Sequence, residues 1–248
     1  MIRSKLGLKA LGLCALVVGL MAVSAGVAQA EEPGGAWTFL NVQGKELLEL
    51  PNNETIGGRL DGTSGTLLTE IAKTKVGFTC ESFKATGAKL IKGGTALGLL
   101  VFEKCFTTLN GTKSAACEPK AGGTEKGVIK TLELEGRLLL HKLKEKPTDK
   151  VFIVEPDVAA GANSFAHIEL SEECSIGENV LIFGTFAFID CLGHGEVHEV
   201  EHLVTEFEPL TKIWAISNTA EHAARIDGSA FVFLTGANIG KEWAALWK

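Results

Sequence analysis

The chain has 248 residues, with 24 basic and 30 acidic side chains and a formal net charge of -6. An acidic chain of this kind lacks the positive surface that attracts phosphate groups, so nucleic acid and anionic membrane surfaces are not expected as partners. Glycine is abundant at 29 residues, which is typical of a chain with many tight turns.

The first 30 residues have the features of a secretory signal peptide. Three basic residues lie within the first nine positions, residues 10–27 carry no charge, and Ala28-Gln29-Ala30 matches the small-x-small cleavage pattern. An uncleaved anchor is the alternative, because the apolar segment approaches the roughly 20 residues that span a bilayer. We predict cleavage after Ala30. The remaining 218 residues, with 21 basic and 30 acidic side chains, carry a charge of -9 and form a secreted, extracellular protein without a membrane segment.

After residue 35 the chain consists of short apolar runs separated by glycine-based turn signals about 8–12 residues apart, which favours a β sandwich or barrel. In chain order, strands are expected within 37–50, 66–80, 88–91, 95–105, 127–143, 151–154, 165–170, 180–189, 213–216 and 230–235. Asp61-Gly62, Gly93-Gly94, Asn110-Gly111 and Asp227-Gly228 mark turns. We predict a mainly β fold, a sandwich or irregular barrel of short antiparallel strands stabilised by disulfides, with few short helices.

A dense run of charge, His141 to Lys150 (HKLKEKPTDK), interrupts this pattern. It is interpreted as a solvated loop or hairpin tip, and the alternative is a boundary between two similar halves. We predict a single β-rich domain over residues 31–248, because consecutive strands usually pair and no long polar linker is present.

Five cysteines remain after cleavage, and disulfides are the usual state of cysteine in an exported chain. A G-x-x-x-F-x-x-C pattern ends at Cys105 and again at Cys191, and each copy has another cysteine upstream. This repeat predicts the pairs Cys80–Cys105 and Cys174–Cys191, with Cys117 unpaired. The competing pair is Cys105–Cys117, which would close a hairpin through Asn110-Gly111.

Residues His198-Glu199-Val200-Glu201-His202 spell H-E-x-x-H. On a helix, two histidines four positions apart face the same way and can bind zinc, while the intervening Glu199 can act as a general base. Apolar residues in the segment 195–207 recur at helical spacing, and His194 could supply a third ligand.

Several residues around this motif argue against a zinc enzyme. Glu196 and Glu201 are charged at positions where zinc-peptidase helices are normally uncharged, and Gly193 and Gly195 lie where such a helix should already be established. We therefore expect a polar face rich in histidine and glutamate, and assign no catalytic, cofactor-binding or metal-binding residue. A strand in this segment would place Glu199 on the side opposite the histidines.

Six segments of the mature chain resemble a group of uncharacterised exported proteins from high-GC Gram-positive bacteria. They are FTCESFKATG (78–87), FEKC (102–105), ACEPK (116–120), ECSIG (173–177), EHLVTEFEPLT (201–211) and IDGSAFVFLTGA (226–237). The resemblance implies a signal peptide and a β-rich body, and it implies no activity, ligand or catalytic residue.

Two functional hypotheses follow from these features. The first is an exported, non-enzymatic β protein with a structural or ligand-binding role at or outside the cell surface. For a binding surface the residues to inspect are Trp37, Trp214, Trp243 and Trp247, most of which we expect in the core. The alternative is a secreted zinc-dependent hydrolase that uses His198, Glu199 and His202, the only case in which zinc would be a cofactor.

Overall fold

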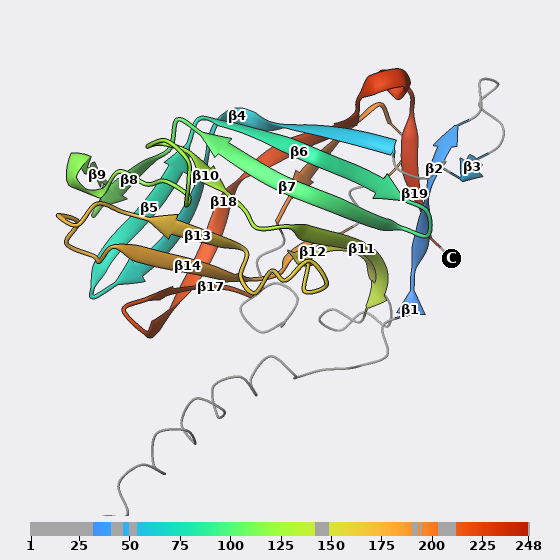
Figure 1. Cartoon of the computed structure of the whole chain (residues 1–248). Helices are drawn as coiled ribbons and strands as arrows, with labels where there is room; N and C mark the ends of the chain where they lie inside the picture. Colours follow the sequence, from blue (N-terminus) through green and yellow to red (C-terminus); the bar gives the residue numbers. More distant parts are fainter. Residues whose placement is uncertain are drawn as a thin grey trace, which may run out of the picture. The chain divides into compact units, whose positions relative to one another are not determined.

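A computed structural model describes residues 32–40, 47–49, 54–141, 149–189, 193, 195–202 and 212–247 (Figure 1). The predicted signal peptide lies outside these residues. Strands dominate the described chain, all strand pairs are antiparallel, and the helices described there are the short 3₁₀ segments Ala115–Cys117 and Gly236–Asn238. The mainly β prediction is confirmed. Within the described residues, no helix has the length and hydropathy needed to cross a bilayer.

The strands belong to the unit that runs from Glu32 to Lys248. Their bounds are β1 Glu32–Pro33, β2 Gly35–Leu40, β3 Leu47–Glu49, β4 Glu54–Ile71, β5 Thr74–Cys80, β6 Ser82–Ile91, β7 Thr95–Glu103, β8 Phe106–Leu109, β9 Thr112–Lys113, β10 Ile129–Lys130, β11 Leu134–His141, β12 Asp149–Pro156, β13 Ala166–Glu169, β14 Asn179–Gly184, β15 Phe186–Ile189, β16 Val197–Glu201, β17 Ile213–Ser217, β18 Ala220–Leu234 and β19 Trp243–Trp247.

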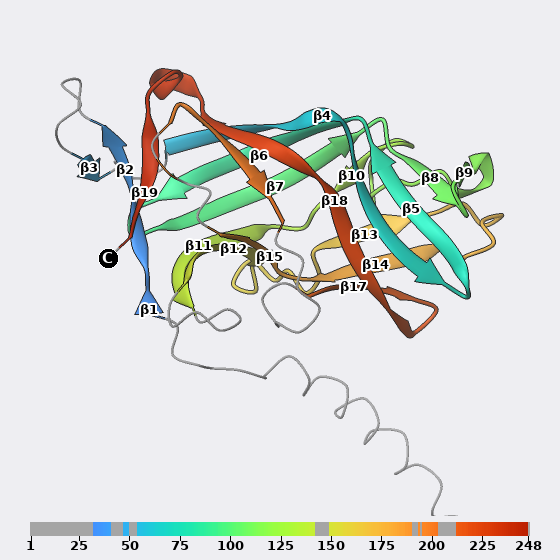
Figure 2. The same cartoon turned by 180° about the vertical axis from the view of Figure 1, so that it is seen from behind.

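Two long strands, β4 and β18, pair with each other and form the spine of the main sheet (Figure 2). Each changes its second neighbour along its length. The first two residues of β4 pair with β6 and its second half pairs with β5, while β18 pairs first with β17 and then with β16. The path through the sheet runs β13-β14-β17-β18-β4-β6-β7-β11-β12-β15. The two ends of the β4–β18 pair therefore have different neighbouring strands, β6 and β16 at one end and β5 and β17 at the other.

The spine is interrupted where the sequence predicts turns. Asp227 is opposite Thr66 and Ser229 is opposite Asp61, so Gly228 on β18 and residues 62–65 on β4 fall outside the β4–β18 register. Gly62 and Gly228 have φ of +90° and +125°. The turns expected at Asp61-Gly62 and Asp227-Gly228 are thus wrong. The glycines form a local irregularity inside continuous strands, because the residues on both sides remain paired with the other spine strand.

The main sheet curls until β13, at one end of the path, meets the segment that follows β10. Strand β10 pairs with β7, and Thr131, which follows β10, bridges to Ala166 of β13. The amide of Leu132 donates a hydrogen bond to the Phe165 carbonyl at 3.0 Å beside this bridge. The circuit β13-β14-β17-β18-β4-β6-β7-β10 therefore returns to β13, which gives an irregular barrel with a short seam.

Two hairpins match the turn and loop predictions. Leu109 of β8 pairs with Thr112 of β9, and the intervening Asn110 and Gly111 have φ of +50° and +84°, as a two-residue hairpin turn requires. Strands β11 and β12 pair over their whole length up to His141 opposite Asp149. The charge run therefore begins at the end of β11 and ends at the start of β12, and residues 142–148 themselves lie outside the described residues.

A small second sheet has the order β19-β2-β3. Its tryptophans Trp37 and Trp243 are almost fully buried, and their ring centroids are 5.9 Å apart. The Trp37 indole donates a hydrogen bond to the Thr95 carbonyl at 2.7 Å, which ties this sheet to β7. Trp243 and Trp247 are four positions apart, as on one face of a helix, but both lie on strand β19.

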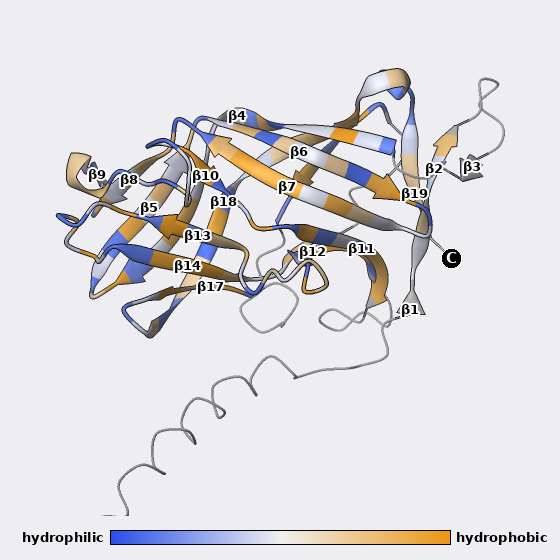
Figure 3. Ribbon diagram, viewed as in Figure 1, coloured by the Kyte–Doolittle hydropathy of each residue, from blue (hydrophilic) through white to orange (hydrophobic). Residues whose placement is uncertain are grey.

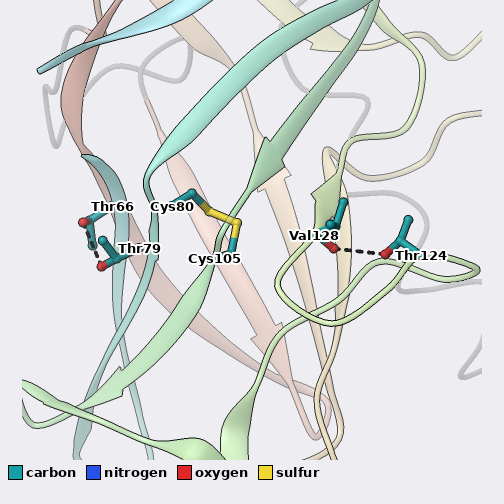
Figure 4. The surroundings of a disulfide bond; sticks show 6 residues. All are labelled: Thr66, Thr79, Cys80, Cys105, Thr124 and Val128. Atoms are coloured by element: carbon teal, nitrogen blue, oxygen red, sulfur yellow. Dashed lines mark hydrogen bonds between the residues drawn. A yellow bond between two sulfur atoms is a disulfide. The ribbon is translucent and has the colours of Figure 1, made fainter. Parts of the chain in front are cut away.

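One of the two predicted disulfides is present. Cys80 and Cys105 are bonded between the end of β5 and the segment that follows β7 (Figure 4). Cys174 is bonded to Cys117, so the predicted pair Cys174–Cys191 is wrong, as is the prediction that Cys117 is unpaired. Cys191 lies outside the described residues.

The pairing of Cys117 with Cys174 follows from contacts that are distant in sequence. Lys120 and Glu169 exchange backbone hydrogen bonds of 3.0 and 2.8 Å, and the Ser171 hydroxyl donates to the Ala116 carbonyl. These bonds place the 3₁₀ segment that ends at Cys117 beside the β13–β14 connection. The repeated G-x-x-x-F-x-x-C pattern therefore reflects no common disulfide unit.

Candidate functional site: an apolar cavity inside the barrel

The first four residues of the H-E-x-x-H motif lie on strand β16 and His202 follows it directly, so the helix suggested by the apolar spacing is absent over Val197–Glu201. Along this strand burial alternates. His198, Val200 and His202 are 5 %, 8 % and 8 % exposed, whereas Glu199 and Glu201 are exposed. Successive side chains of a strand point to opposite faces, so Glu199 is separated from both histidines by the backbone.

Both histidines bond to the backbone of other strands. Nε2 of His198 lies 3.0 Å from the Trp243 carbonyl oxygen, and its ring meets the Trp243 ring edge-on. Nδ1 of His202 accepts a hydrogen bond of 3.1 Å from the Ala187 amide, and its ring packs edge-on against Phe186. These contacts give the two rings a structural role that the sequence motif does not suggest.

The zinc-peptidase arrangement does not form on this strand. In an extended chain, residues four positions apart are separated by about 13 Å, which is too far for two imidazoles to share one ion. Among the described residues, no three histidine, cysteine, aspartate or glutamate side chains gather closely enough to hold a metal. His194 lies outside the described residues.

The tryptophans divide into two groups. Trp37 and Trp243 are 1 % and 2 % exposed, so they belong to the core. Trp214 and Trp247 are half-buried. Trp214 is directly opposite Phe183 in the β14–β17 ladder, and the two rings stack at a centroid distance of 5.8 Å. The expectation that most tryptophans are buried is right for the first pair.

A cavity of about 250 Å³ lies inside the barrel. Side chains from β4, β5, β6, β7, β10, β11, β12, β13, β14, β15, β16 and β18 line it. Its walls include seven phenylalanines: Phe78, Phe83, Phe102, Phe152, Phe165, Phe186 and Phe188. Figure 3 shows much of β7, one of these walls, in the hydrophobic colour. An apolar interior of this kind is the usual form of a small-molecule site.

Small side chains account for the empty space between these rings. On β6 and β7, the residues that line the cavity include Ala85, Ala88, Ala96 and Gly98. Gly98 also permits a close approach, because a Cβ at this position would lie 2.5 Å from the Ala88 Cα. The inward rows of β6 and β7 therefore each contain consecutive small residues, and the size of inward residues in a small barrel decides whether the interior is filled or hollow.

The cavity has little charge on its walls. The ionisable side chains among its described lining residues are His202 and Asp227, and His202 is held by the Ala187 amide. Asp227 and Gly228, at the interruption of the spine, are the exposed members of the described lining. Close by, the Ser229 hydroxyl donates to Oδ2 of Asp61 at 3.2 Å, and Nη2 of Arg225 donates to Oδ2 of Asp227 at 3.3 Å.

Sequence reasoning missed this cavity. Alternation identifies which residues of a strand face inward, but it does not say which inward residues meet across the barrel. A usable signal was the occurrence of Ala85, Ala88, Ala96 and Gly98 among apolar residues of two consecutive strands.

No protein-family model matches the chain, and no curated protein or solved structure is significantly similar to it.

Proposed function

We propose that this is an exported protein, released by cleavage after Ala30, which acts outside the cell without catalysis by holding a small apolar molecule inside its β barrel. The observation that carries the proposal is the phenylalanine-lined cavity of about 250 Å³. Export is supported by the features of residues 1–30 and by two disulfides, which persist mainly in oxidising compartments.

The size of the cavity limits its ligand. An apolar protein cavity of about 150 Å³ stays dry and binds benzene, which has six carbon atoms. By the same proportion, a cavity of 250 Å³ accommodates about ten carbon atoms. The driving force is the removal of apolar surface from water, on both the ligand and the exposed parts of the lining.

Naphthalene, with its ten carbon atoms, is a suitable probe, and its binding to the full mature protein can be measured by equilibrium dialysis. The decisive variant is Ala230→Phe, because Ala230 lines the cavity and a phenyl ring there would occupy the ligand's space. The matched control is Ala223→Phe, an exposed position on the same strand outside the cavity lining.

We expect saturable naphthalene binding by the wild type and by Ala223→Phe, and a loss of at least about tenfold in affinity for Ala230→Phe. Circular dichroism must show that both variants remain folded, and Ala230→Leu replaces Ala230→Phe if the latter unfolds. Absence of binding by the wild type, or equal binding by wild type and the cavity variants, would contradict the proposal.

A further inference from the structure

One buried hydroxyl of the cavity lining has a proton that no residue of the described chain accepts. Thr131 is 3 % exposed and lines the cavity directly after β10. We infer that Thr131 anchors the ligand by donating this proton, so that the ligand is an uncharged, mainly apolar molecule with one hydrogen-bond acceptor, such as a ketone or ester carbonyl. This inference rests on the proposed function, because it concerns the same cavity.

The strand pairing places the Thr131 side chain on the inner surface of the barrel. Its amide donates to the Leu100 carbonyl at 2.9 Å, which extends the pairing of β10 with β7 by one residue. Ile129, two positions earlier, is 5 % exposed and lines the same cavity. Residues two apart in an extended chain face the same side. Thr131 therefore faces the interior together with Ile129.

The hydroxyl of Thr131 acts as an acceptor within the protein. The Leu100 amide donates a hydrogen bond to its oxygen, Oγ1, at 2.9 Å. This bond occupies one lone pair of the oxygen and leaves the hydroxyl proton available for donation. Among the described residues, the Leu100 amide is the partner of this hydroxyl, and none accepts its proton. A ligand atom that accepts the proton would therefore satisfy a buried donor.

The other polar side chains of the described lining are bonded within the protein. Their hydrogen-bond partners are Thr79 for Thr66, the Ala187 amide for His202, Arg225 for Asp227 and Asp61 for Ser229.

The acceptor on the ligand is uncharged, because the described lining contains no lysine or arginine to compensate a buried carboxylate. An alcohol is a poorer match than a carbonyl, since it brings a proton of its own that needs an acceptor in the cavity. A carbonyl oxygen only accepts, and Thr131 offers the donor that it needs.

Tetralin and 1-tetralone test this inference, because both have ten carbon atoms in two fused rings and only the second has a carbonyl. Equilibrium dialysis against the mature protein at pH 7 measures their dissociation constants, and the wild type should bind both. In Thr131→Val, the ratio of the 1-tetralone constant to the tetralin constant should rise about tenfold, because the buried carbonyl loses its donor. The effect of the substitution on the Leu100 amide is common to both ligands and cancels in the ratio.

Two control variants separate the hydroxyl from general effects of the substitution. Thr131→Ser keeps the hydroxyl and should leave the ratio within about twofold of the wild type. Thr107→Val makes the same exchange at another fully buried threonine, on β8 and outside the cavity lining, and should also leave the ratio unchanged.

Infrared spectroscopy of bound 1-tetralone labelled with ¹³C at the carbonyl gives a second readout, which requires only the wild type. A hydrogen bond lowers the stretching frequency of a carbonyl. We expect the bound ligand to absorb at lower frequency than the same ligand in hexane. A frequency equal to that in hexane would overturn the inference, including in the case that Thr131→Val fails to fold.

The outcomes distinguish failure of the two proposals. If neither tetralin nor 1-tetralone binds to the wild type, the proposed function itself fails. If both bind but their ratio is the same in the wild type and Thr131→Val, the cavity is a binding site and Thr131 is not its anchor. A ratio that changes equally in Thr131→Val and Thr107→Val would also overturn the inference.

Discussion

The backbone amide of Ala187 donates a hydrogen bond of 3.1 Å to Nδ1 of His202, so this nitrogen carries no proton and the ring is in the neutral Nε2–H form. The bond joins the start of β15 to the residue that follows β16. The buried imidazole thus satisfies a buried amide that would otherwise have to find another acceptor.

Replacement of His202 by leucine keeps the apolar contact with Phe186 and removes the acceptor for the Ala187 amide. We expect a loss of about 1–3 kcal/mol in the free energy of unfolding, the cost of a buried unsatisfied donor. Urea denaturation of His202→Leu measures it. Glu199→Gln, an exposed change three residues earlier on β16, should stay within about 0.5 kcal/mol of wild type. Equal stability of the two variants would contradict the structural role of His202.

Zinc should not be retained through the H-E-x-x-H motif, because β16 is a strand and directs Glu199 away from the histidines. After incubation with an equimolar zinc salt and dialysis, elemental mass spectrometry should give the same zinc content for wild type and for His198→Ala, His202→Ala. EDTA should leave the melting temperature of the wild type unchanged. One zinc per chain that disappears in the double variant would instead support a metal site.

Peptide mapping without reduction should find Cys80 linked to Cys105 and Cys117 linked to Cys174. The second bond closes a loop of 57 residues and the first a loop of 25. On the chain-entropy account, removing them costs about 4.2 and about 3.5 kcal/mol respectively. Guanidinium denaturation of the paired serine variants checks the order. Detection of a Cys174–Cys191 peptide would contradict this connectivity.

Gly98 should not tolerate a side chain. Its φ is +152°, and an added Cβ would lie 2.5 Å from the Cα and 2.7 Å from the Cβ of Ala88. Gly98→Ala is therefore expected to lower the free energy of unfolding by about 2–4 kcal/mol. In the matched variant Gly111→Ala the backbone also has positive φ, but nothing lies within 4 Å of the new atom. This variant should cost only about 1 kcal/mol. Similar losses in the two variants, measured by thermal denaturation, would count against the close approach of β6 and β7.

The protein recovered from the culture medium of a bacterial host should begin at Glu31, because Ala28-Gln29-Ala30 precedes it as a small-x-small site. Intact-mass measurement decides this to within one residue. Ala28→Lys should block processing and leave the full-length chain associated with cells. A wild-type chain that keeps residues 1–30 would support the uncleaved anchor instead.

Predictions from local patterns were most accurate where the backbone conformation depends only on neighbouring residues. Asn110-Gly111 forms the predicted hairpin turn because both residues accept positive φ at small cost. The turn at Ala72 and Lys73 was not predicted, because alanine and lysine are not residue types that favour positive φ, and here they adopt φ of +49° and +67°. Strand β4 therefore ends within the single run expected over 66–80.

Spacing was misleading where one pattern fits two structures. Val197 and Val200 are three apart, as on a helix, but the strand pairs of β16 with β18 impose an extended chain and a period of two. The charge run at 141–150 fits a hairpin or a boundary equally well as a sequence pattern, and only the register of β11 and β12 places His141 opposite Asp149.

By itself, the sequence determined a mainly β chain with cysteines suited to an oxidising compartment, because turn residues, alternation and composition act over a few neighbouring residues. Only the tertiary structure decided that Cys174 bonds to Cys117 and that His202 accepts a hydrogen bond from the Ala187 amide. It also decided that the inward alanines and glycines leave a cavity among the phenylalanines. Each of these features joins residues that are not neighbours in sequence, and the ladder register that brings them together depends on the whole sheet.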